Sequence, residues 1–475
     1  MVKNVIMVVL AGLVAVFGVL LVNREIATGP PAAEDPAETI PTPLQYAEAR
    51  VDEMLDSGVF ASTAIGFCLM DDQGEVLIAR NASQAYIPAS TLKTLTTVSA
   101  LEILGPDFRF ETPLLADGPI SETGELVGDL MMAGSGDPTL DTANLANWVV
   151  ALREAGLKEI SGGIVGDATY FPEEIAGEFW NWGDVGNGYG SPVAGLNLNR
   201  NRFKAVLRPA DEAGAAAVLI DVSPAVPDVQ WVTRVRSGSV NDVMIYGGPR
   251  ATQLVLRGSV KRGEDYEVMG AVPDPALFAA SEFDRQLRAA GVGIGKPPST
   301  VPFVQEAEPP RPGTTLLTHR SAPLSEIVRY INEVSDNHGA ECLFRRLGEH
   351  HRSYNADSLI FNHWSGRGLD LGSCRLVDGS GLGRANFITA LDLTRLQHLA
   401  RRGPQGDTYY ESLNAYYEGA FHFKIGAMSR IRCYTGYVMG ESGREFTFSL
   451  MFNHYDHETD VSQWVKRILP SLRLL

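Results

Sequence analysis

The feature that most constrains the fold is a change in amino-acid composition and hydrophobic pattern between residues 115 and 310. On either side the chain carries helical and strand-like patterns, whereas this stretch is rich in glycine and in short apolar runs typical of β-strands. We therefore predict one α/β domain built from residues 44–114 and 311–475. Residues 115–310 are expected to form a β-rich insertion of one or two small domains, with a smaller module nested at about 205–275.

The two flanking parts carry patterns clear enough to assign elements. Residues 43–57 have the period of an amphipathic helix, and two strands joined by Asp72-Gln73-Gly74 follow it as a hairpin. A second helix runs from about Ser90 to Gly105, where a Gly-Pro pair stops it. Near the C-terminus, two strand patterns precede a final helix at residues 461–469. The predicted domain thus draws its elements from both ends of the chain.

The N-terminus carries an uninterrupted run of 18 apolar or glycine residues, from Val5 to Val22. That length lies between a signal-peptide core and a spanning helix, so residues 1–24 are interpreted as a signal peptide or a membrane anchor. The uncleaved anchor is favoured because no small-residue cleavage site follows closely. Residues 25–43, rich in proline, alanine and acid, predict a tether. Both alternatives predict an extracytoplasmic, periplasmic protein that meets the membrane only through this segment.

Composition narrows the function classes. Hydrophobic residues make up 45% of the chain, enough for a substantial core. The net charge is −17 and no Lys/Arg block is present, so a nucleic-acid partner is not expected. The four cysteines lack metal-ligand spacing, and neither a metal nor a cofactor is predicted. Buried free thiols are their simplest interpretation, with a Cys342–Cys374 disulfide left open.

Ser90 and Lys93 stand three residues apart at the start of the second predicted helix, where they share one face. A lysine that is desolvated there can lose its proton and act as a base for the serine. Alone, this S-x-x-K spacing is a weak signal, because such pairs also occur on ordinary helix surfaces.

Two further motifs follow downstream. Ser335-Asp336-Asn337 opens a loop between two helical stretches, where a second hydroxyl and an amide can relay protons and hold a substrate; S-D-N also favours a plain polar turn. Lys424-Ile425-Gly426-Ala427 lies on a predicted strand whose small residues let a substrate backbone pass alongside. A lysine that protects an edge strand from aggregation is the simpler interpretation of that motif.

Taken together and in this order, the three motifs resemble the S-x-x-K, S-D-N and K-T-G signatures of the penicillin-recognising serine acyl-transferases. Ser335 lies 245 residues after Ser90, which is too far for a compact β-lactamase. The chain is therefore similar to the D-alanyl-D-alanine carboxypeptidase/endopeptidase family S13, the class C low-molecular-mass penicillin-binding proteins. Runs such as LVGDLMMAGSGDPTL, FWNWGDVGNGYGSPVAGLNLNRN and VDGSGLGRANFIT extend the resemblance over residues 45–475. It implies a transpeptidase-type domain, an antiparallel sheet flanked by helices.

The resemblance also implies roles. Ser90 would be the acylated nucleophile and Lys93 its base, and Ser335, Asn337 and Lys424 would complete the catalytic group. The backbone N–H groups of Ser90 and Ala427 would form the oxyanion hole, which could lower the barrier by roughly 3–4 kcal/mol.

Substrate-binding roles carry over in the same way. Asp184 and Tyr189 would contact the peptide side chain next to the scissile bond, and an acid there suits the amine end of diaminopimelate. Arg384 would meet a carboxylate. Ile425, Gly426 and Ser429 would line the substrate along the strand. Ordinary turn and loop positions are the alternative for Asp184 and Arg384.

One position departs from the family pattern. Ile425 replaces the threonine whose hydroxyl would bind the terminal carboxylate, and Ala427 replaces a frequent hydroxyl residue. A lost hydrogen bond to a charged group typically costs about 1.5–3 kcal/mol. Trimming of terminal D-Ala is therefore in question, whereas cleavage of cross-links can survive if the carboxylate is met elsewhere.

Two functions follow from these observations. The first is a serine-type D-Ala-D-Ala carboxypeptidase/DD-endopeptidase that acts on peptidoglycan stem peptides through an acyl-enzyme, with β-lactams as covalent inhibitors. The alternative is a catalytically impaired scaffold of the same fold that binds cell-wall peptide or partners, and Ile425 is the feature in its favour. The oligomeric state stays open.

Overall fold

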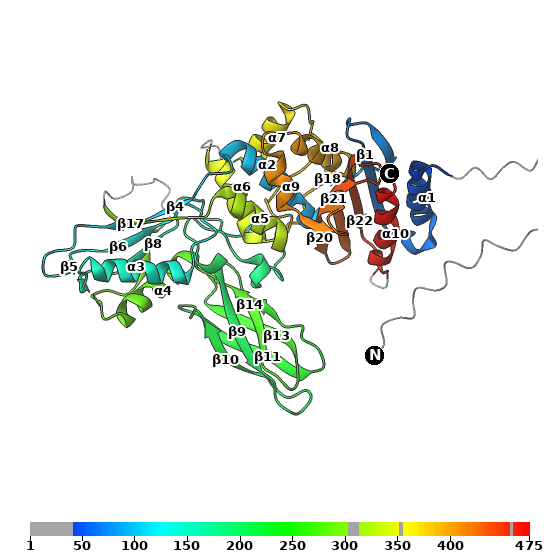
Figure 1. Cartoon of the computed structure of the whole chain (residues 1–475). Helices are drawn as coiled ribbons and strands as arrows, with labels where there is room; N and C mark the ends of the chain where they lie inside the picture. The colour runs from blue at the N-terminus through cyan, green and yellow to red at the C-terminus, as the bar shows by residue number, and fades with distance from the viewer. Residues whose placement is uncertain (1–40, 303–312, 351–354, 457–458) are drawn as a thin grey trace, which may run out of the picture. The chain divides into compact units, whose positions relative to one another are not determined.

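The computed structural model of the chain describes residues 41–302, 313–350, 355–456 and 459–475, and Pro43–Leu475 form one compact unit. Its central element is a six-stranded antiparallel sheet with the order β19-β20-β21-β22-β1-β2 (Figure 1). The strands are β1 (Ala64–Met70), β2 (Val76–Arg80), β19 (Asn414–Tyr416), β20 (Phe421–Met428), β21 (Ile431–Met439) and β22 (Glu445–Asn453). The first and last parts of the chain therefore share one sheet, as predicted.

Side chains of this sheet alternate between two apolar clusters, as the pleat of a strand requires. Phe67, Tyr434 and Phe448 face a cluster shared with α1 (Pro43–Asp56) and α10 (Val461–Arg473), which lie next to each other in Figure 1. Cys68 and Cys433 face the opposite cluster. The helices on that second side are α2 (Lys93–Leu104), α5 (Leu324–Val334), α6 (Asn337–His350), α7 (Ala356–Ser365), α8 (Ala390–Arg401) and α9 (Gly406–Ser412).

The elements predicted for the flanking parts are confirmed. The first helix is α1, the hairpin is β1 and β2, and α2 ends at Gly105, whose φ of 87° suits glycine. The late strands and the final helix are β21, β22 and α10. The start of the second helix differs in detail, because Ser90 lies in a separate 3₁₀ turn, η2 (Ala89–Leu92), and α2 begins only at Lys93.

The inserted part, which runs from β4 to β17, is built on a five-stranded sheet with the order β16-β8-β6-β4-β17. The strands are β4 (Glu111–Ala116), β6 (Leu130–Ala133), β8 (Ile164–Asp167), β16 (Ser299–Thr300) and β17 (Thr314–Arg320). Since β4 and β17 pair with each other, the chain enters and leaves this sheet side by side, at Glu111 and Arg320, outside the predicted limits of 115 and 310. The division into domains stays a prediction.

The description of the insertion as β-rich missed two helices, α3 (Thr142–Glu154) and α4 (Pro275–Ala289). Both begin at aspartates that accept a hydrogen bond from the first turn, Asp141 and Asp274. They pack on each other through an edge-to-face contact of Trp148 and Phe283, with the ring centroids 5.7 Å apart.

A smaller β module lies within the inserted part, between Arg202 and Ala271 (Figure 1). One of its three-stranded sheets has the order β10-β9-β14 and the other β11-β13-β12. The strands are β9 (Arg202–Arg208), β10 (Val218–Ser223), β11 (Gln230–Gly238), β12 (Met244–Tyr246), β13 (Gln253–Lys261) and β14 (Tyr266–Ala271).

The cysteines do not form the disulfide that the sequence left open. All four thiols are free, and Cys342 is fully buried, with its sulfur 3.7 Å from Nδ1 of His338. Among the described residues no helix is long and apolar enough to cross a membrane, and the apolar run Val5–Val22 lies outside those residues.

Candidate active site

The predicted nucleophile and base meet where the η2 turn joins α2. Ser90 is half-buried in η2, and Lys93, the first residue of α2, is completely buried. The turn that presents Ser90 starts at Ala89, whose φ of 48° is unusual for a residue with a side chain. Such a backbone conformation is tolerated only where the surroundings hold it.

The Lys93 amine contacts three oxygen atoms. Its Nζ lies 2.9 Å from Oγ of Ser90, 2.6 Å from Oδ1 of Asn337 and 2.6 Å from the backbone carbonyl oxygen of Ser380. Burial holds the pKa of the Lys93 amine well below its usual value of 10.5, and the nearby Lys424 ammonium lowers it further. The charges of Asp378 and Asp336 act in the opposite direction.

The Ser335-Asp336-Asn337 motif forms the turn between α5 and α6, as predicted. Ser335 ends α5 in the left-handed region with φ 59°, and within the described part of the chain its hydroxyl has no hydrogen-bond partner. Asn337 begins α6 and links two segments: its Oδ1 faces Lys93, while its Nδ2 donates to the carbonyl of Tyr189 at 2.8 Å. The motif thereby connects the base to the inserted part.

Strand β20 lies directly against the nucleophile turn. A Cβ added to Gly426 would stand 2.6 Å from the Pro88 carbonyl oxygen and 3.0 Å from the Ser90 nitrogen, so only glycine permits this approach. Lys424 is 3% exposed, and within the described part of the chain its amine donates only to the neighbouring Ile425 carbonyl, at 3.3 Å. Burial lowers the pKa of the Lys424 amine to about 8.

The backbone N–H of Ala427 is directed away from β21. Met428 and Ile431 flank the two-residue turn of the β20–β21 hairpin and form a hydrogen-bonded pair, so the next pair, Ala427 with Arg432, is a non-hydrogen-bonded one. On its other side, β20 pairs with β19 only from Phe421 to Phe423. The Ala427 N–H therefore points to the open edge of the strand, the edge that η2 approaches.

Ile425 lies on a different face from Lys424. Its side chain packs against the α1/α10 cluster, next to Phe423 and Tyr434, as the alternation along β20 requires. Its position at the open edge of the sheet leaves it half-buried.

Asp184 and Tyr189 lie in the loop of the inserted part that reaches the motif turn. The Tyr189 hydroxyl donates to Oδ1 of Asp184 at 3.0 Å, and Nδ2 of Asn181 donates to Oδ2 at 2.9 Å. Arg384 donates to the carbonyl of Ser429 at 3.1 Å, which joins its loop to the β20–β21 turn. The structure thus brings the predicted site residues to Ser90, β20, the motif turn or the loops that contact them, except that the Ile425 side chain lies on the face of β20 opposite Lys424.

Sequence reasoning missed two groups. One is the turn of residues 378–383, which supplies the Ser380 carbonyl to Lys93 and packs on η2 so closely that a Cβ at Gly381 would stand 1.9 Å from the Ala89 oxygen. The other is the pair Arg200 and Arg202, which holds the buried Asp336. A D-G-S-G-L run and two closely spaced arginines were visible in the sequence, but only their partners in space show what they hold.

Comparison with known proteins identifies the family. Residues 47–469 match the model of the D-Ala-D-Ala carboxypeptidase 3 (S13) family. The chain belongs to this family. The protein is accordingly an enzyme of the serine peptidase class, as the motifs predicted.

Named relatives agree with that assignment. The D-alanyl-D-alanine carboxypeptidase of Actinomadura sp. (strain R39) is 28% identical over 85% of this chain and 80% of the relative. The D-alanyl-D-alanine carboxypeptidase DacB of Haemophilus influenzae is 30% identical over 71% of each chain. The crystal structure of penicillin-binding protein 4 from Haemophilus influenzae superimposes with a TM-score of 0.78 and 23% identity, over 89% of this chain and 99% of that one. The last match confirms the predicted fold, with its transpeptidase-type sheet and inserted β-rich part.

Proposed function

We propose that this member of the S13 family is a serine-type D-Ala-D-Ala carboxypeptidase/DD-endopeptidase that cleaves peptidoglycan stem peptides through an acyl-enzyme on Ser90. The observation that carries the proposal is the set of contacts around a completely buried Lys93. The relatives' names, D-alanyl-D-alanine carboxypeptidase among them, support the substrate class. An impaired scaffold is the weaker alternative, since none of the acylation groups is missing.

The contacts of Lys93 suit a neutral amine. Its neighbours Asn337 Oδ1 and Ser380 O can only accept hydrogen bonds, and a neutral amine has two N–H groups to give them. Its lone pair is then left for the third neighbour, the Ser90 hydroxyl, 2.9 Å away. Lys93 is therefore proposed to take the Ser90 proton as Oγ attacks the carbonyl carbon next to the scissile bond.

The remaining roles follow from position. The N–H groups of Ser90 and Ala427 are proposed to hold the oxyanion. Ser335, whose hydroxyl has no partner among the described residues, is proposed to pass the proton to the leaving amine, and Lys424 to bind substrate charge. A water activated by Lys93 would then release the acyl group.

Asp184, Tyr189 and Arg384 are proposed to bind the substrate, with Gly426 and Ser429 along the strand. With Ile425 in place of a hydroxyl residue, we expect weaker trimming of terminal D-Ala than cleavage of cross-links. The extracytoplasmic location is inferred from the wall substrate and from the N-terminal apolar run; fractionation that finds the native protein in the cytoplasm would contradict it.

The test is covalent labelling of the purified protein with a fluorescent penicillin, together with a muropeptide digest. We expect a label that is lost in Ser90→Ala, and digestion products in which cross-links are cut more than pentapeptides are trimmed. A β-lactam is a reasonable probe because penicillin-binding protein 4 of Haemophilus influenzae has been crystallised in complex with one. No Ser90-dependent label and no muropeptide turnover would instead favour the scaffold.

A further inference from the structure

The turn of residues 378–383 is organised by one buried carboxylate. Asp378 is 1% exposed, and none of the described lysines or arginines pairs with it. Its Oδ1 accepts from the Ser380 N–H at 2.9 Å, the Ser380 hydroxyl at 3.0 Å and the Gly381 N–H at 2.7 Å. Its Oδ2 accepts from the Gly383 N–H at 2.7 Å, Asn386 Nδ2 at 3.1 Å and Trp180 Nε1 at 3.1 Å. Six donors therefore fix the turn around this side chain.

The turn matters because its Ser380 carbonyl accepts from the Lys93 amine. That carbonyl and Asn337 Oδ1 orient the two N–H groups of a neutral amine, and so direct the lone pair at Ser90. A shift of the carbonyl would rotate the amine and misdirect the lone pair. The conformation that Asp378 imposes on the turn therefore sets the geometry of the base.

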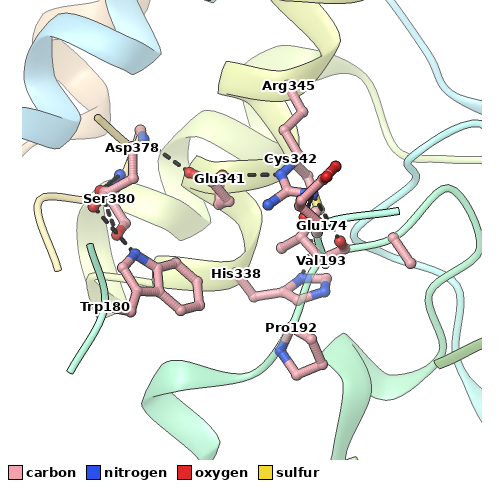
Figure 2. A network of polar contacts seen from close by, with 12 residues as sticks. Glu174, Trp180, Pro192, Val193, His338, Glu341, Cys342, Arg345, Asp378 and Ser380 are labelled. Carbon is pink, nitrogen blue, oxygen red and sulfur yellow. Dashed lines mark hydrogen bonds and ion pairs between the residues drawn. The ribbon is translucent and has the colours of Figure 1, made fainter. Parts of the chain in front are cut away.

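Two connections run from this turn to residues 174–193 of the inserted part (Figure 2). The first is the bond from the Trp180 ring to Asp378. In the second, Glu341 accepts from the Gly379 N–H at 2.9 Å and from Arg345 Nε at 2.9 Å, and Arg345 donates onward to the carbonyls of Glu174 and Val193. The same stretch, residues 174–193, carries Asp184 and Tyr189.

We propose that Asp378 is a positioning residue for the Lys93 amine, and that Trp180 of the inserted part acts on this amine through Asp378. The proposal rests on the function proposed above for Ser90 and Lys93. It makes the inserted part a contributor to the chemistry, because the loop that reaches the substrate side is hydrogen-bonded to the group that orients the base.

A purely structural role for Asp378 predicts a different pH dependence. The charged groups that face Lys93 are Lys424 on β20, Asp336 in the motif turn, itself paired with two arginines, and Asp378. Asp378→Asn keeps the size of the side chain but removes a negative charge that raises the pKa of Lys93. If Asp378 acts on the amine, the acid-side midpoint of acylation moves to lower pH, while the limiting rate falls because the turn is held less well.

The experiment measures the second-order rate of acylation by a fluorescent penicillin from pH 5 to pH 10. We expect Asp378→Asn to lower the limiting rate at least about tenfold and to move the midpoint downward. Trp180→Phe removes one donor and should lower the rate by about three- to tenfold. In the double variant, Trp180→Phe should have little further effect, because its influence passes through Asp378. Trp182→Phe, an exposed tryptophan two residues away, is the matched control and should leave the midpoint unchanged.

An unchanged midpoint in Asp378→Asn, or additive effects in the double variant, overturns the proposal. If Asp378→Asn does not fold, the two tryptophan variants decide the question: a Trp180→Phe rate within twofold of Trp182→Phe overturns it, and a larger loss supports it. The proposed function is tested separately by the wild-type protein, which must acquire a label that Ser90→Ala loses.

Discussion

At the scale of single residues, the site holds two buried lysines, and no carboxylate of the described residues contacts either of them directly. Taking an ammonium group out of water is unfavourable unless it is paired, so each lysine either gives up its proton or destabilises the fold. Lys93 gains two acceptors in exchange, whereas Lys424 has a single long hydrogen bond. Lys424 is therefore the residue at which function and stability should conflict most.

We predict that Lys424→Met stabilises the protein at pH 7 while it slows acylation. The lowered pKa of Lys424, about 8 against 10.5, corresponds to about 3 kcal/mol of unfavourable burial below pH 8. Between pH 8 and 10.5 the unfolded state binds more protons, so wild-type stability rises with pH in that window and the advantage of the variant shrinks. Urea unfolding at pH 7 and pH 10 measures both. Lys466→Met, at an exposed position on α10, is the control. If Lys424→Met gained the same free energy of unfolding over the wild type at both pH values, the prediction would be contradicted.

A second prediction concerns Ile425. Although Ile425 packs against the α1/α10 cluster, its side chain is only half-buried at the open edge of β20. A hydroxyl on that exposed part would offer a charged carboxylate about 1.4 kcal/mol of binding, so Ile425→Thr should raise the rate of penicillin acylation and of D-Ala release about tenfold. The matched control is Ile425→Val, which loses similar contact with the α1/α10 cluster but adds no hydroxyl. Stopped-flow acylation compares them. Equal rates for the Thr and Val variants would mean that the carboxylate is met elsewhere, with Arg384, which contacts the β20–β21 turn, as the candidate.

Ser90, Lys93 and Asn337 were predictable because side-chain chemistry at fixed spacing carries their signal, and the structure brings them within hydrogen-bond distance. The Ser380 contribution was not predictable, since it is a backbone carbonyl that any residue can supply. Ile425 shows a signal that was available and unused: alternation along a strand already places it on the opposite face from Lys424.

At the scale of elements, the site depends on how closely β20 approaches η2. Gly426 allows this contact because it has no side chain, and Gly381 does the same for the turn of residues 378–383 on the other side of Ala89. The nucleophile turn is thus held between two glycine contacts, and this closeness is what brings the Ser90 N–H towards the open edge of β20.

We predict that Gly426→Ala lowers acylation by about 100- to 1,000-fold, the range for loss of one oxyanion donor, because the added methyl group would separate β20 from η2. Stability should fall by only about 1–3 kcal/mol. Penicillin labelling and thermal unfolding of the same preparations measure the two effects. Gly58→Ala is the control, because a Cβ at Gly58 meets no atom within 4 Å. Full labelling of Gly426→Ala would contradict the prediction, because it would show that β20 can accommodate a methyl group without moving away from η2.

The helices α3 and α4 show why elements of the insertion were harder to predict. Their apolar residues are surrounded in the sequence by short, glycine-rich strands, so the local composition suggested β structure throughout. The capping aspartates Asp141 and Asp274, the latter followed by Pro275, were the stronger signals. In the flanking parts, segments such as α1 and α10 have a long helical period, and no strand-like composition around them argued against a helix.

At the scale of the whole molecule, the inserted part and the catalytic motif turn are joined by buried charges. Arg202 begins β9 and donates to Oδ1 of Asp336 at 2.9 Å, and Arg200 donates to Oδ2 at 3.1 Å. Burial alone would raise the pKa of Asp336. The charge of Arg202, then those of His338 and Arg200, and the Gly339 N–H outweigh burial and hold that pKa below its usual value. Asp336 therefore stabilises the fold above its unfolded pKa, and this contribution is lost as the pH falls through the folded one.

The last prediction follows from this pair of arginines. Arg202→Met should destabilise the protein by about 3–5 kcal/mol at pH 7, because it leaves a buried carboxylate half-paired. The pKa of Asp336 then rises, so the carboxyl becomes neutral at a higher pH and the difference from the wild type should shrink towards pH 4. Unfolding at pH 7 and pH 4 measures this, with Arg208→Met on the same strand as the control, because Arg208 pairs with Asp265 at the surface and should leave unfolding unchanged. Since Asn337 adjoins Asp336 and contacts Lys93, acylation should fall in Arg202→Met even in the folded fraction. The prediction would be contradicted if the variant lost stability equally at both pH values, or if the folded variant were acylated at the wild-type rate. Either result would show that the Arg202–Asp336 ion pair only holds the inserted part against the motif turn and does not orient Asn337.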